Sequence, residues 1–560
     1  MKDRKNWLTL GSCNLLFALT FVFFAPMEVL LLNSGEFHFT FISFWWFQLL
    51  LALAGAGLLT LGMQLLPGKA KVTAAAMALG ASAAAWVQML MLNGKMIRLV
   101  GEEMQVSGPE KLWNGILWIA VAAGVVITAW LLSRRGKDVR GWMSAAAAFL
   151  TAVQLIAFVS LLFTTDYSVE EDSHSFTCKG EFELSSGTNV VEFMLDASDG
   201  EFVHQMLDAY PEVKDQLNGW VYYPNAVSMY SRTFPSLIYM LSGAKTHLDV
   251  PVKEYVDAAF AESDFLPNLN AAGTDIRIYT MDNSYVSTAT DGMVQNSRKR
   301  ENVIGDLNLV SLEKGLARIS LYKCMPYFAK PWFSYEVGVL NAVCFRESNY
   351  IWYDPVFYSD LRKQASFTVN GNYDRAYRFY HLWGSHGGAW WNDRLETVEE
   401  DTESYERLRG SFRILDEYCE KLKAAGLYDS ALIIVTADHG VSNDDLANLA
   451  RNRAACPLMM VKYPYSDEGK LLEVSRKPVC HDDLFSTIAD ALGAERPTAG
   501  SGRTIREIAD DEVRERYHYY TALDKRWKPK LMREYVVRGD AEDFASWQPT
   551  GNTWDVLIDW

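Results

Sequence analysis

Five apolar stretches, each long enough to cross a bilayer, occupy most of the first 164 residues of this 560-residue chain. They lie at about 7–32, 39–66, 72–92, 112–132 and 142–163. A cleaved signal peptide does not explain the first stretch, because it is long and a second follows at once. The sequence therefore predicts a transmembrane bundle of five helices over residues 1–164.

Basic residues set the expected orientation of this bundle. Nine of its twelve Lys and Arg residues precede the first stretch or lie between the second and third or the fourth and fifth: Lys2, Arg4, Lys5, Lys69, Lys71, Arg134, Arg135, Lys137 and Arg140. Segments rich in Lys and Arg stay in the cytoplasm. We therefore expect a multi-pass protein of the plasma or inner membrane, with a cytoplasmic N-terminus and an extracytoplasmic second part.

The charge of the two parts differs. Residues 1–164 carry 12 basic and 7 acidic side chains, whereas the whole chain has a net charge of −16, so the second part is strongly acidic. Such a surface argues against binding to nucleic acid. Glu28 is the single acid inside an apolar stretch, and no stretch holds the chain of acids or histidines that a transporter tends to carry.

The second part has the pattern of an α/β domain. Residues 165–187 are polar and suit a linker, and in 188–560 strand-like segments alternate with helix-like ones. This predicts a three-layer α/β domain with a mostly parallel sheet, followed from Arg503 by an antiparallel element. Six of the seven cysteines lie in this part. Cys324 with Cys344 and Cys456 with Cys480 are candidate disulfides, and free buried thiols are equally compatible with the sequence.

Three motifs carry the candidate chemistry. The apolar run 431–435 ends in Asp438 and His439, the run 189–195 ends in Asp196, and Thr233-Phe-Pro-Ser begins an apolar helix-like segment. Polar residues beyond the carboxyl ends of strands are where α/β sheets bind ligands. Two further histidines follow comparable patterns: His386 lies in a loop after the strand-like run 378–382, and His481 precedes a helix. His381, within that run, is expected to face the sheet interior.

Together, Thr-Ala-Asp-His-Gly and Thr-Phe-Pro-Ser followed by Met-Leu-Ser-Gly resemble the alkaline phosphatase superfamily. The closer resemblance is to its membrane-anchored sulfatase-like phosphotransferases, such as lipoteichoic acid synthases and lipid A phosphoethanolamine transferases. The resemblance implies a divalent ion, zinc or manganese, held by Asp196, Thr233, Asp438 and His439. It makes Thr233 the nucleophile, and His386 and His481 groups that contact the phosphate or protonate the leaving oxygen.

Several departures refine this interpretation. Leu237 stands where a sulfatase motif has Arg, so sulfate-ester hydrolysis is disfavoured. Leu382, four residues before His386, and Ala197-Ser198 after Asp196 favour one metal over two. The loop 441–455 holds Arg451, Asn452 and Arg453 but no histidine, which puts an ethanolamine head group in doubt and favours glycerol phosphate or another donor.

The expected function is transfer of a phospho-head group, of the phosphoglycerol or phosphoethanolamine type, from a membrane phospholipid through a phosphothreonine. The acceptor would be a hydroxyl of a cell-envelope glycan, lipid or polymer. Two alternatives stay open on the sequence alone. One is a phosphodiesterase or phosphatase with water as acceptor, and the other is a non-catalytic lipid-sensing envelope regulator with the same architecture.

Overall fold

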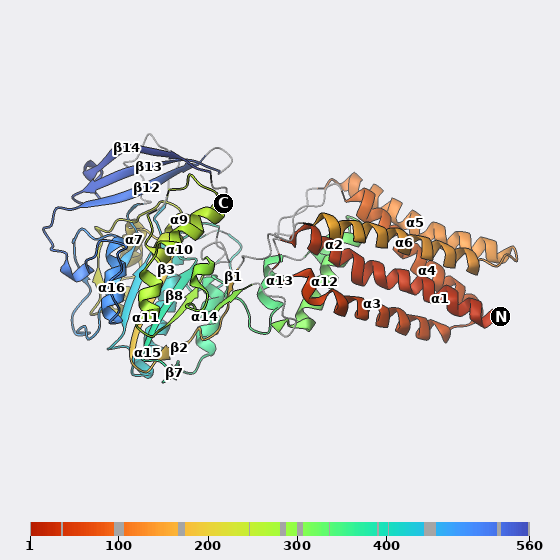
Figure 1. Ribbon diagram of the computed structural model, residues 1–560, viewed down its shortest axis with the longest axis horizontal. Helices are drawn as coiled ribbons and strands as arrows, with labels where there is room; N and C mark the ends of the chain where they lie inside the picture. The colour runs from red at the N-terminus through yellow and green to blue at the C-terminus, as the bar shows by residue number, and fades with distance from the viewer. Residues whose placement is uncertain are drawn as a thin grey trace. The chain divides into compact units, whose positions relative to one another are not determined.

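The computed structural model describes residues 2–34, 37, 39–93, 106–165, 174–245, 247–280, 287–299, 306–334, 337–388, 391–400, 402–441, 455–523 and 528–557. The chain divides into two compact units (Figure 1). Unit 1 comprises Met1–Ser173 and Arg300–Asn349, and unit 2 comprises His174–Lys299 and Tyr350–Trp560. Residues 306–334 and 337–349, which the sequence predicts to be part of the second domain, therefore belong to unit 1 and pack with the N-terminal helices.

Unit 1 contains the five predicted apolar helices, each long and apolar enough to cross a membrane. The first is formed by α1 (Lys2–Ala18), the π-helical turn η1 (Leu19–Phe24) and α2 (Ala25–Leu32). The others are α3 (Phe41–Gln64), α4 (Gly68–Val87) with η3 (Gln88–Leu92), α5 (Gly108–Arg134) and α6 (Arg140–Thr164). Small residues let α4 and α5 approach closely: a Cβ added at Gly80 would lie 2.5 Å from the Ala122 carbonyl oxygen.

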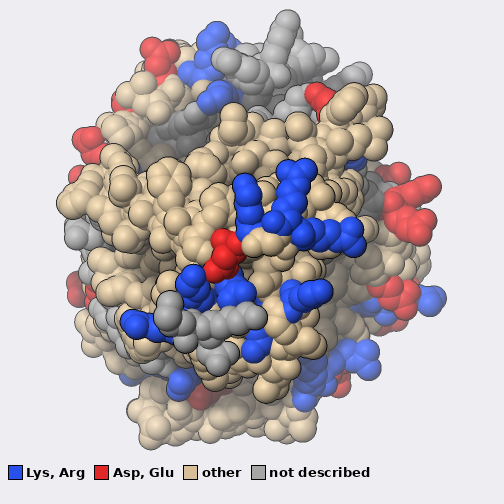
Figure 2. Space-filling view, turned by 90° about the vertical axis from the view of Figure 1, so that its right-hand side faces the viewer, with Lys and Arg blue, Asp and Glu red and all other residues tan. Residues whose placement is uncertain are grey.

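One end of the bundle is strongly basic. Lys and Arg side chains gather on the face that Figure 2 shows. The segments at this end are the N-terminus, the α3–α4 connection and the α5–α6 connection, and they supply Arg4, Lys5, Lys69, Arg134, Arg135 and Lys137, all exposed. Asp138 pairs with Lys5 at 3.0 Å. The residues that predicted a cytoplasmic face from the sequence thus lie together in space.

The returning segment of unit 1 consists of α12 (Leu309–Cys324), the 3-10 turn η7 (Lys330–Phe333) and α13 (Val337–Val343). Polar contacts attach α12 to the apolar helices: Ser320 Oγ donates to the Phe21 carbonyl oxygen at 2.5 Å, and Trp118 Nε1 donates to that of Cys324 at 3.0 Å. Lys323 Nζ lies 2.9 Å from Glu28 Oε1. The single acid inside an apolar stretch is therefore neutralised by a residue almost 300 positions away.

Unit 2 is built on a seven-stranded sheet with the order β11-β4-β10-β9-β3-β8-β5. The four strands β9 (Leu432–Thr436), β3 (Thr188–Leu195), β8 (Arg375–Leu382) and β5 (Thr274–Tyr279) are parallel. β10 (Met459–Lys462) runs antiparallel to β9 and to β4 (Val221–Tyr222), and β11 (Glu473–Val474) is parallel to β4. The predicted mostly parallel sheet is confirmed.

Alternating side chains of this sheet face two helical layers. Val190 and Met194 pack on the side of α9 (Thr233–Ser242), α10 (Val252–Ala261), α11 (Phe265–Ala271) and α16 (Asp482–Ala491). Val191, Phe193 and Leu195 pack on the side of α7 (Gly200–Ala209), α8 (Glu212–Gln216), α14 (Asp354–Lys363) and α15 (Ser404–Ala424). Because both faces are buried, five of the eight residues of β3 are apolar, and the three-layer prediction is confirmed.

The remaining elements are small. A three-stranded antiparallel sheet, β12 (Glu515–Leu523), β13 (Pro529–Arg538) and β14 (Trp547–Asp555), forms the expected C-terminal element. Two two-stranded sheets pair β1 (His174–Phe176) with β6 (Ser297–Lys299) and β2 (Glu183–Ser185) with β7 (Thr368–Asn370). The 3-10 turns are η5 (Thr288–Thr290), η10 (Ile505–Glu507) and η11 (Phe544–Ser546). All seven cysteines are free, so neither candidate disulfide forms.

Candidate active site

Strand register brings the first two candidate ligands together. β3 and β9 are parallel neighbours with Met194 opposite Thr436, so Asp196 and Asp438, each two residues further on, leave adjacent strand ends on the same edge. Ala197 adopts a left-handed conformation (φ 53°), which turns the chain immediately after Asp196. The position of the pair follows from the sheet alone, as expected for a site at the carboxyl ends of parallel strands.

Asp196, Asp438 and His439 form a compact buried cluster. Each offers one ligand atom, and these atoms lie within 4.8 Å of one another. Asp438 Oδ1 accepts hydrogen bonds from the backbone N–H groups of Ala197 (3.1 Å) and His439 (2.8 Å), which fixes the carboxylate. Asp196 Oδ1 and Asp438 Oδ2 are buried without a hydrogen-bond partner. Two unsatisfied carboxylate oxygens in one place are costly unless a cation joins them.

The ring of His439 is oriented toward the cluster. Its Nδ1 lies 2.6 Å from the Gly440 carbonyl oxygen, an acceptor, so Nδ1 carries the proton and donates it. Nε2 then presents a lone pair, 3.3 Å from Asp438 Oδ2 and 3.2 Å from Thr233 Oγ1. This is the tautomer that a metal-binding histidine needs, because the other ring nitrogen donates to a fixed acceptor.

Thr233 is the first residue of α9, and the start of this helix lies beside the cluster. Arg232 is extended (φ −143°, ψ 148°) and Gly243 ends the helix in the left-handed conformation (φ 75°). Backbone N–H groups in the first turn of a helix have no partner within it and favour anionic oxygens. The Thr233 hydroxyl therefore lies where a phosphate group would be held by the helix N-terminus and by the neighbouring cluster.

The electrostatics of the two carboxylates differ. Burial, and then repulsion from Asp196, raise the pKa of Asp438 above its usual range. Burial also acts against ionisation of Asp196, but the nearby rings of His381, His386 and His439 outweigh it and lower the pKa of Asp196. A second negative charge is therefore unfavourable here in the absence of a cation.

His381 is a neighbour of the cluster that the sequence analysis did not include among the site residues. It is fully buried on β8, opposite Met194, and its Nε2 lies 3.7 Å from Asp196 Oδ2. Its Nδ1 lies 2.9 Å from Thr280 Oγ1, and Nε2 has no hydrogen-bond partner. His381 faces the interior of the domain, as expected, and there it lies beside Asp196 at the candidate site. The signal available was its position one residue before the strand end.

His386 lies in the loop after β8 and is exposed. This loop touches the backbone beside Asp196: Ser385 N–H donates to the Asp196 carbonyl oxygen at 3.0 Å, and a Cβ at Gly384 (φ 61°) would lie 2.7 Å from the Leu195 carbonyl carbon. The His386 Nδ1 lies 2.9 Å from the Gly387 oxygen. The ring is therefore near Asp196 and open to solvent, where an incoming substrate would meet it.

His481 has a different environment. It is buried, and its Nε2 lies 3.0 Å from the carbonyl oxygen of Ala437, the residue before Asp438. The Met229 N–H donates to its Nδ1 at 3.5 Å. Burial lowers the pKa of His481 to about 4. Both ring nitrogens thus contact backbone groups, so the geometry favours a role in fixing the Asp438 strand end over proton transfer to a substrate.

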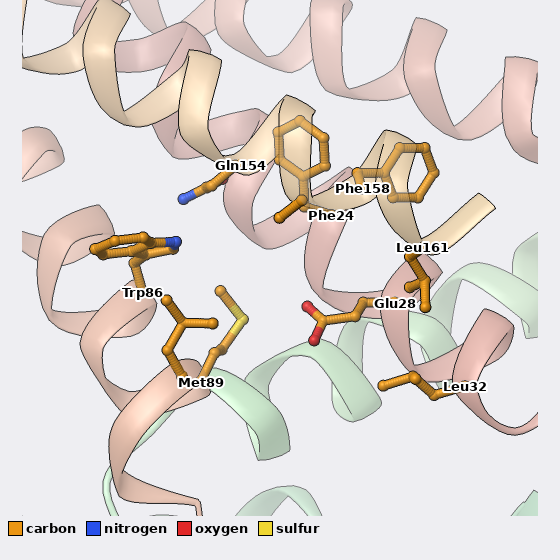
Figure 3. A pocket seen from close by; sticks show the side chains of 10 residues that line it. Phe24, Glu28, Leu32, Trp86, Met89, Gln154, Phe158 and Leu161 are labelled. Atoms are coloured by element: carbon orange, nitrogen blue, oxygen red, sulfur yellow. The ribbon is translucent and has the colours of Figure 1, made fainter. Parts of the chain in front are cut away.

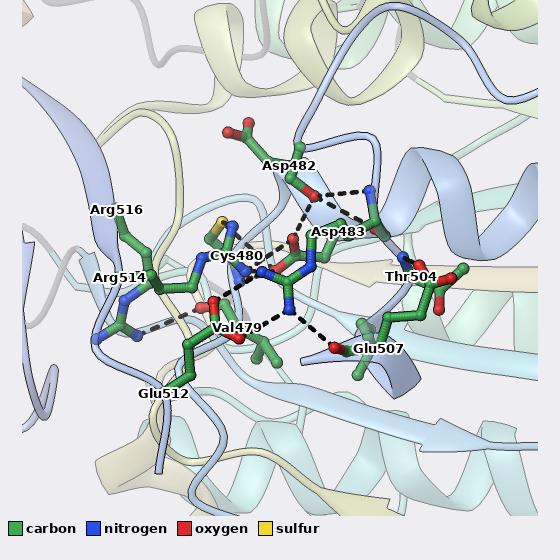
Figure 4. Close-up of polar contacts among 12 residues, drawn as sticks. Val479, Cys480, Asp482, Asp483, Thr504, Glu507, Glu512, Arg514 and Arg516 are labelled. Atoms are coloured by element: carbon green, nitrogen blue, oxygen red, sulfur yellow. Dashed lines mark hydrogen bonds and ion pairs between the residues drawn. The ribbon is translucent and has the colours of Figure 1, made fainter. Parts of the chain in front are cut away.

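A polar network anchors the segment that carries His481 (Figure 4). Asp483, in the first turn of α16, accepts from Arg514 Nη1 at 3.0 Å, from Ser501 Oγ at 2.6 Å and from the Cys480 N–H at 2.9 Å. Arg514 immediately precedes β12. The network therefore ties the start of α16 to the C-terminal sheet, which in turn pairs with the chain leading to Thr233 through Tyr519 and Tyr230.

His518 on β12 was also absent from the sequence-based site. Its Nδ1 lies 2.8 Å from the Ser228 carbonyl oxygen, and burial lowers its pKa to about 4. Both His439 and His481 act on it electrostatically. It holds the backbone five residues before Thr233. No local motif marks it, because a lone histidine in a strand is most often a core residue.

The described residues fit a divalent cation. Two buried carboxylates with unpaired oxygens, an imidazole with a fixed tautomer and a threonine hydroxyl make a mixed oxygen and nitrogen donor set, which suits zinc or manganese equally. Residues 442–454, which include Arg451, Asn452 and Arg453, lie outside the described residues.

No protein-family model and no curated protein sequence matches the chain. Among solved structures, it is similar to the integral membrane lipooligosaccharide phosphoethanolamine transferase A of Neisseria meningitidis (14% identity, TM-score 0.31), with 88% of this chain and 96% of that chain covered. It is also similar to a phosphonate monoester hydrolase from Silicibacter pomeroyi (14%, TM-score 0.35, 65% and 88%). A third is an alkaline phosphatase superfamily protein from Vibrio parahaemolyticus (12%, TM-score 0.37, 69% and 87%).

These low identities and TM-scores assign no reaction to the chain, and its chemistry rests on its own residues. The solved structures to which it is similar are members of the alkaline phosphatase superfamily, the group that its sequence resembles.

Proposed function

We propose that this protein is a metal-dependent phosphotransferase that moves a phospho-head group from a membrane phospholipid to a hydroxyl of an envelope glycan, lipid or polymer. The observation that carries the proposal is the position of the Thr233 hydroxyl. It lies 3.2 Å from His439 Nε2, beside two carboxylates with unpaired buried oxygens and at a helix N-terminus. A threonine that only started a helix would not need this cluster.

Asp196, Asp438, His439 and Thr233 are the residues that would hold the ion. A bound zinc or manganese ion would lower the pKa of the threonine hydroxyl and neutralise phosphate charge. The chain's own residues do the rest. The Thr233 hydroxyl gives up its proton to solvent and its Oγ attacks phosphorus. The bond from phosphorus to the diacylglycerol oxygen breaks, and His386, exposed in the loop beside Asp196, supplies a proton to that leaving oxygen. An acceptor hydroxyl then gives its proton to His386 and attacks the phosphothreonine, and the released Thr233 Oγ takes up a proton from solvent.

The five apolar helices give such an enzyme access to its lipid donor. The basic end of the bundle supports a cytoplasmic location for the N-terminus and an extracytoplasmic location for the site. We propose the plasma or inner membrane as its location. Ethanolamine carries an ammonium group and glycerol does not, but both are joined to phosphate through an ester oxygen, so the Thr233 chemistry alone does not separate the two head groups.

The test is mass spectrometry of the Thr233 peptide from full-length protein incubated with mixed membrane phospholipids. The parent protein should carry an adduct whose mass names the head group. Thr233→Ala should lose the adduct and lower turnover by about 10⁴-fold or more, as for other lost nucleophiles. Thr233→Ser, which keeps a hydroxyl, is the matched control and should retain an adduct. Full turnover by Thr233→Ala would overturn the proposal.

The acceptor is tested separately. A transferase should release head-group phosphate slowly alone and faster when a hydroxyl acceptor is added. Equal rates with and without acceptor would make the protein a phosphodiesterase or phosphatase. A folded protein that binds no metal and forms no adduct would make it a regulator.

A further inference from the structure

Unit 1 contains a cavity of about 170 Å³ among its apolar helices (Figure 3). It is bounded by α2, by α4 with η3, and by α6, and its lining is apolar except for two side chains, Glu28 and Gln154. Trp86, Met89, Phe158 and Leu161 are among the apolar lining residues. A cavity made for packing alone would have no reason to include an acid and an amide.

Gln154 is the more informative of the two polar side chains. It is 5% exposed, its Oε1 accepts a hydrogen bond from Thr20 Oγ1 at 3.0 Å, and its Nε2 has no partner. Figure 3 shows its amide end projecting from α6 on the side of Trp86. A donor without a partner in a membrane-spanning helix is costly. An occupant with a hydrogen-bond acceptor would satisfy this donor.

Glu28 imposes a complementary requirement. Its Oε1 is 2.9 Å from Lys323 Nζ, so its charge is already balanced. The carboxylate projects into the cavity in Figure 3 and is about one third exposed (34%). Because a carboxylate only accepts hydrogen bonds, an occupant at this point must donate one through N–H or O–H. A free metal ion is disfavoured beside the Lys323 ammonium.

The residues around the cavity indicate that its occupant is a lipid. Leu32 and Leu90, which also line the cavity, are 61% and 58% exposed in the absence of a membrane, so they face the bilayer. The volume slightly exceeds that of an apolar cavity that holds one benzene molecule, about 150 Å³. It admits the polar end of one lipid while the acyl chains stay among the bilayer lipids.

We propose that this cavity binds the polar end of one membrane phospholipid whose head group carries N–H or O–H donors. The Glu28 carboxylate accepts from the head group, and Gln154 Nε2 donates to an ester carbonyl. Ethanolamine and glycerol head groups share this donor chemistry, whereas choline, a quaternary ammonium, has no N–H and no O–H. The site lies wholly in unit 1 and does not depend on the Thr233 chemistry.

Binding is measured on full-length Thr233→Ala protein, so that turnover cannot consume the lipid. Phosphatidylethanolamine, phosphatidylglycerol and phosphatidylcholine with identical acyl chains are offered in detergent, and retained lipid is counted by native mass spectrometry. The ethanolamine and glycerol lipids should be retained roughly tenfold more than the choline lipid, the effect of one hydrogen bond to a charged group. Equal retention of all three would overturn the proposal.

Two variants locate the binding. Ala157→Phe fills the cavity, because Ala157 lines it, and should abolish the preference. Ala152→Phe is the matched control, since Ala152 is an exposed residue of the same helix outside the lining, and should retain it. Glu28→Gln should reduce the head-group preference to near equality. If Glu28→Gln does not fold, the Ala157/Ala152 comparison decides. Retention by Ala157→Phe equal to the parent would mean that the lipid binds outside the cavity, and the proposal fails.

Discussion

Unit 1 holds a partly buried acid and unit 2 holds two fully buried acids, and the two units neutralise these acids differently. In unit 1, Glu28 is paired with Lys323 at 2.9 Å. In unit 2, Asp196 and Asp438 face each other, and within the described residues only imidazoles, not Lys or Arg, lie within ion-pair distance of them. The charge of an acid that is paired with an ammonium group is already balanced. Two acids without one are stable only when a cation is supplied from outside.

This difference separates an acid that supports structure or ligand orientation from acids that bind a cation. The chain supplies a lysine for Glu28 from almost 300 positions away, so the fold can pair an acid with a distant basic residue. At the carboxyl end of the sheet it places three histidines near Asp196 instead. Imidazole rings can share a metal ion with the carboxylates, whereas a lysine ammonium would occupy them.

The largest predicted effect comes from removing one of the two unpaired carboxylates. Asp438→Asn should lower turnover by on the order of 10⁴-fold, since a misplaced or missing ion disables the nucleophile. Because burial and Asp196 raise the pKa of Asp438, its charge disfavours folding at neutral pH when no metal is bound. The same variant should therefore raise the melting temperature of the metal-free protein. Metal content, turnover and thermal unfolding with and without chelator give the three readings.

A melting temperature that falls in Asp438→Asn without metal would contradict the proposed repulsion. Glu192→Gln is a useful control, because Glu192 is a buried acid of the neighbouring strand β3 whose Oε2 accepts from Tyr377 at 2.5 Å. It lies on the sheet away from the strand end and should not alter metal content.

Removing the acid of the ion pair in unit 1 should lower the stability of the protein, the opposite of the effect expected for Asp438→Asn without metal. Glu28→Gln leaves the Lys323 ammonium, whose side chain is 6% exposed, without its countercharge, and should cost roughly 3 kcal/mol. Lys323→Met should cost less, roughly 1–2 kcal/mol, because the 34% exposed Glu28 retains access to solvent. Thermal unfolding in detergent measures both. A double variant whose loss of stability equals the sum of the two single losses would show that the two groups are not coupled.

The sequence predicts the site's core because short-range patterns encode it. Apolar runs that end in Asp196 and Asp438 become adjacent once the strands are parallel, and Thr233 followed by Pro235 marks a helix start. His381 was not predicted as a neighbour of Asp196, because strand register cannot be read from one strand. Nor was the return of α12 to unit 1: Leu312, Leu316 and Ile319 have the same helical spacing whether they pack on a sheet or on a membrane bundle.

The boundaries of helices show the same limit. Residues 396–424 have amphipathic helical spacing throughout, yet α15 begins only at Ser404, and Thr397 forms a bridge with Trp391. Residues 201–217 likewise have helical spacing, but they form two helices, α7 and α8, because Pro211 cannot continue the hydrogen bonds of α7. Local composition indicates a helix in both segments. The start of α15 depends on tertiary contacts, and the break between α7 and α8 depends on one proline.

The smallest predicted effect concerns His381. Its Nε2 lies 3.7 Å from Asp196 Oδ2, and Thr280 fixes the ring from the other side at 2.9 Å. If His381 orients Asp196 toward the ion, His381→Gln should weaken metal affinity by about 10–100-fold, the usual effect of removing a group that orients a ligand. Thr280→Val removes the hydrogen bond that fixes the His381 ring but leaves the ring in place, so it should weaken metal affinity by a smaller factor. Metal titration against a competing chelator measures both.

His247→Gln is the matched control for this last change, because His247 is a partly buried histidine of unit 2 that stacks on Trp554 and contacts none of the three clustered ligands. It should leave metal affinity unchanged. Unchanged affinity in His381→Gln as well would mean that the backbone turn at Ala197 is enough to aim Asp196. In that case the carboxylates of unit 2 would depend on the sheet edge alone, whereas Glu28 of unit 1 depends on a distant side chain.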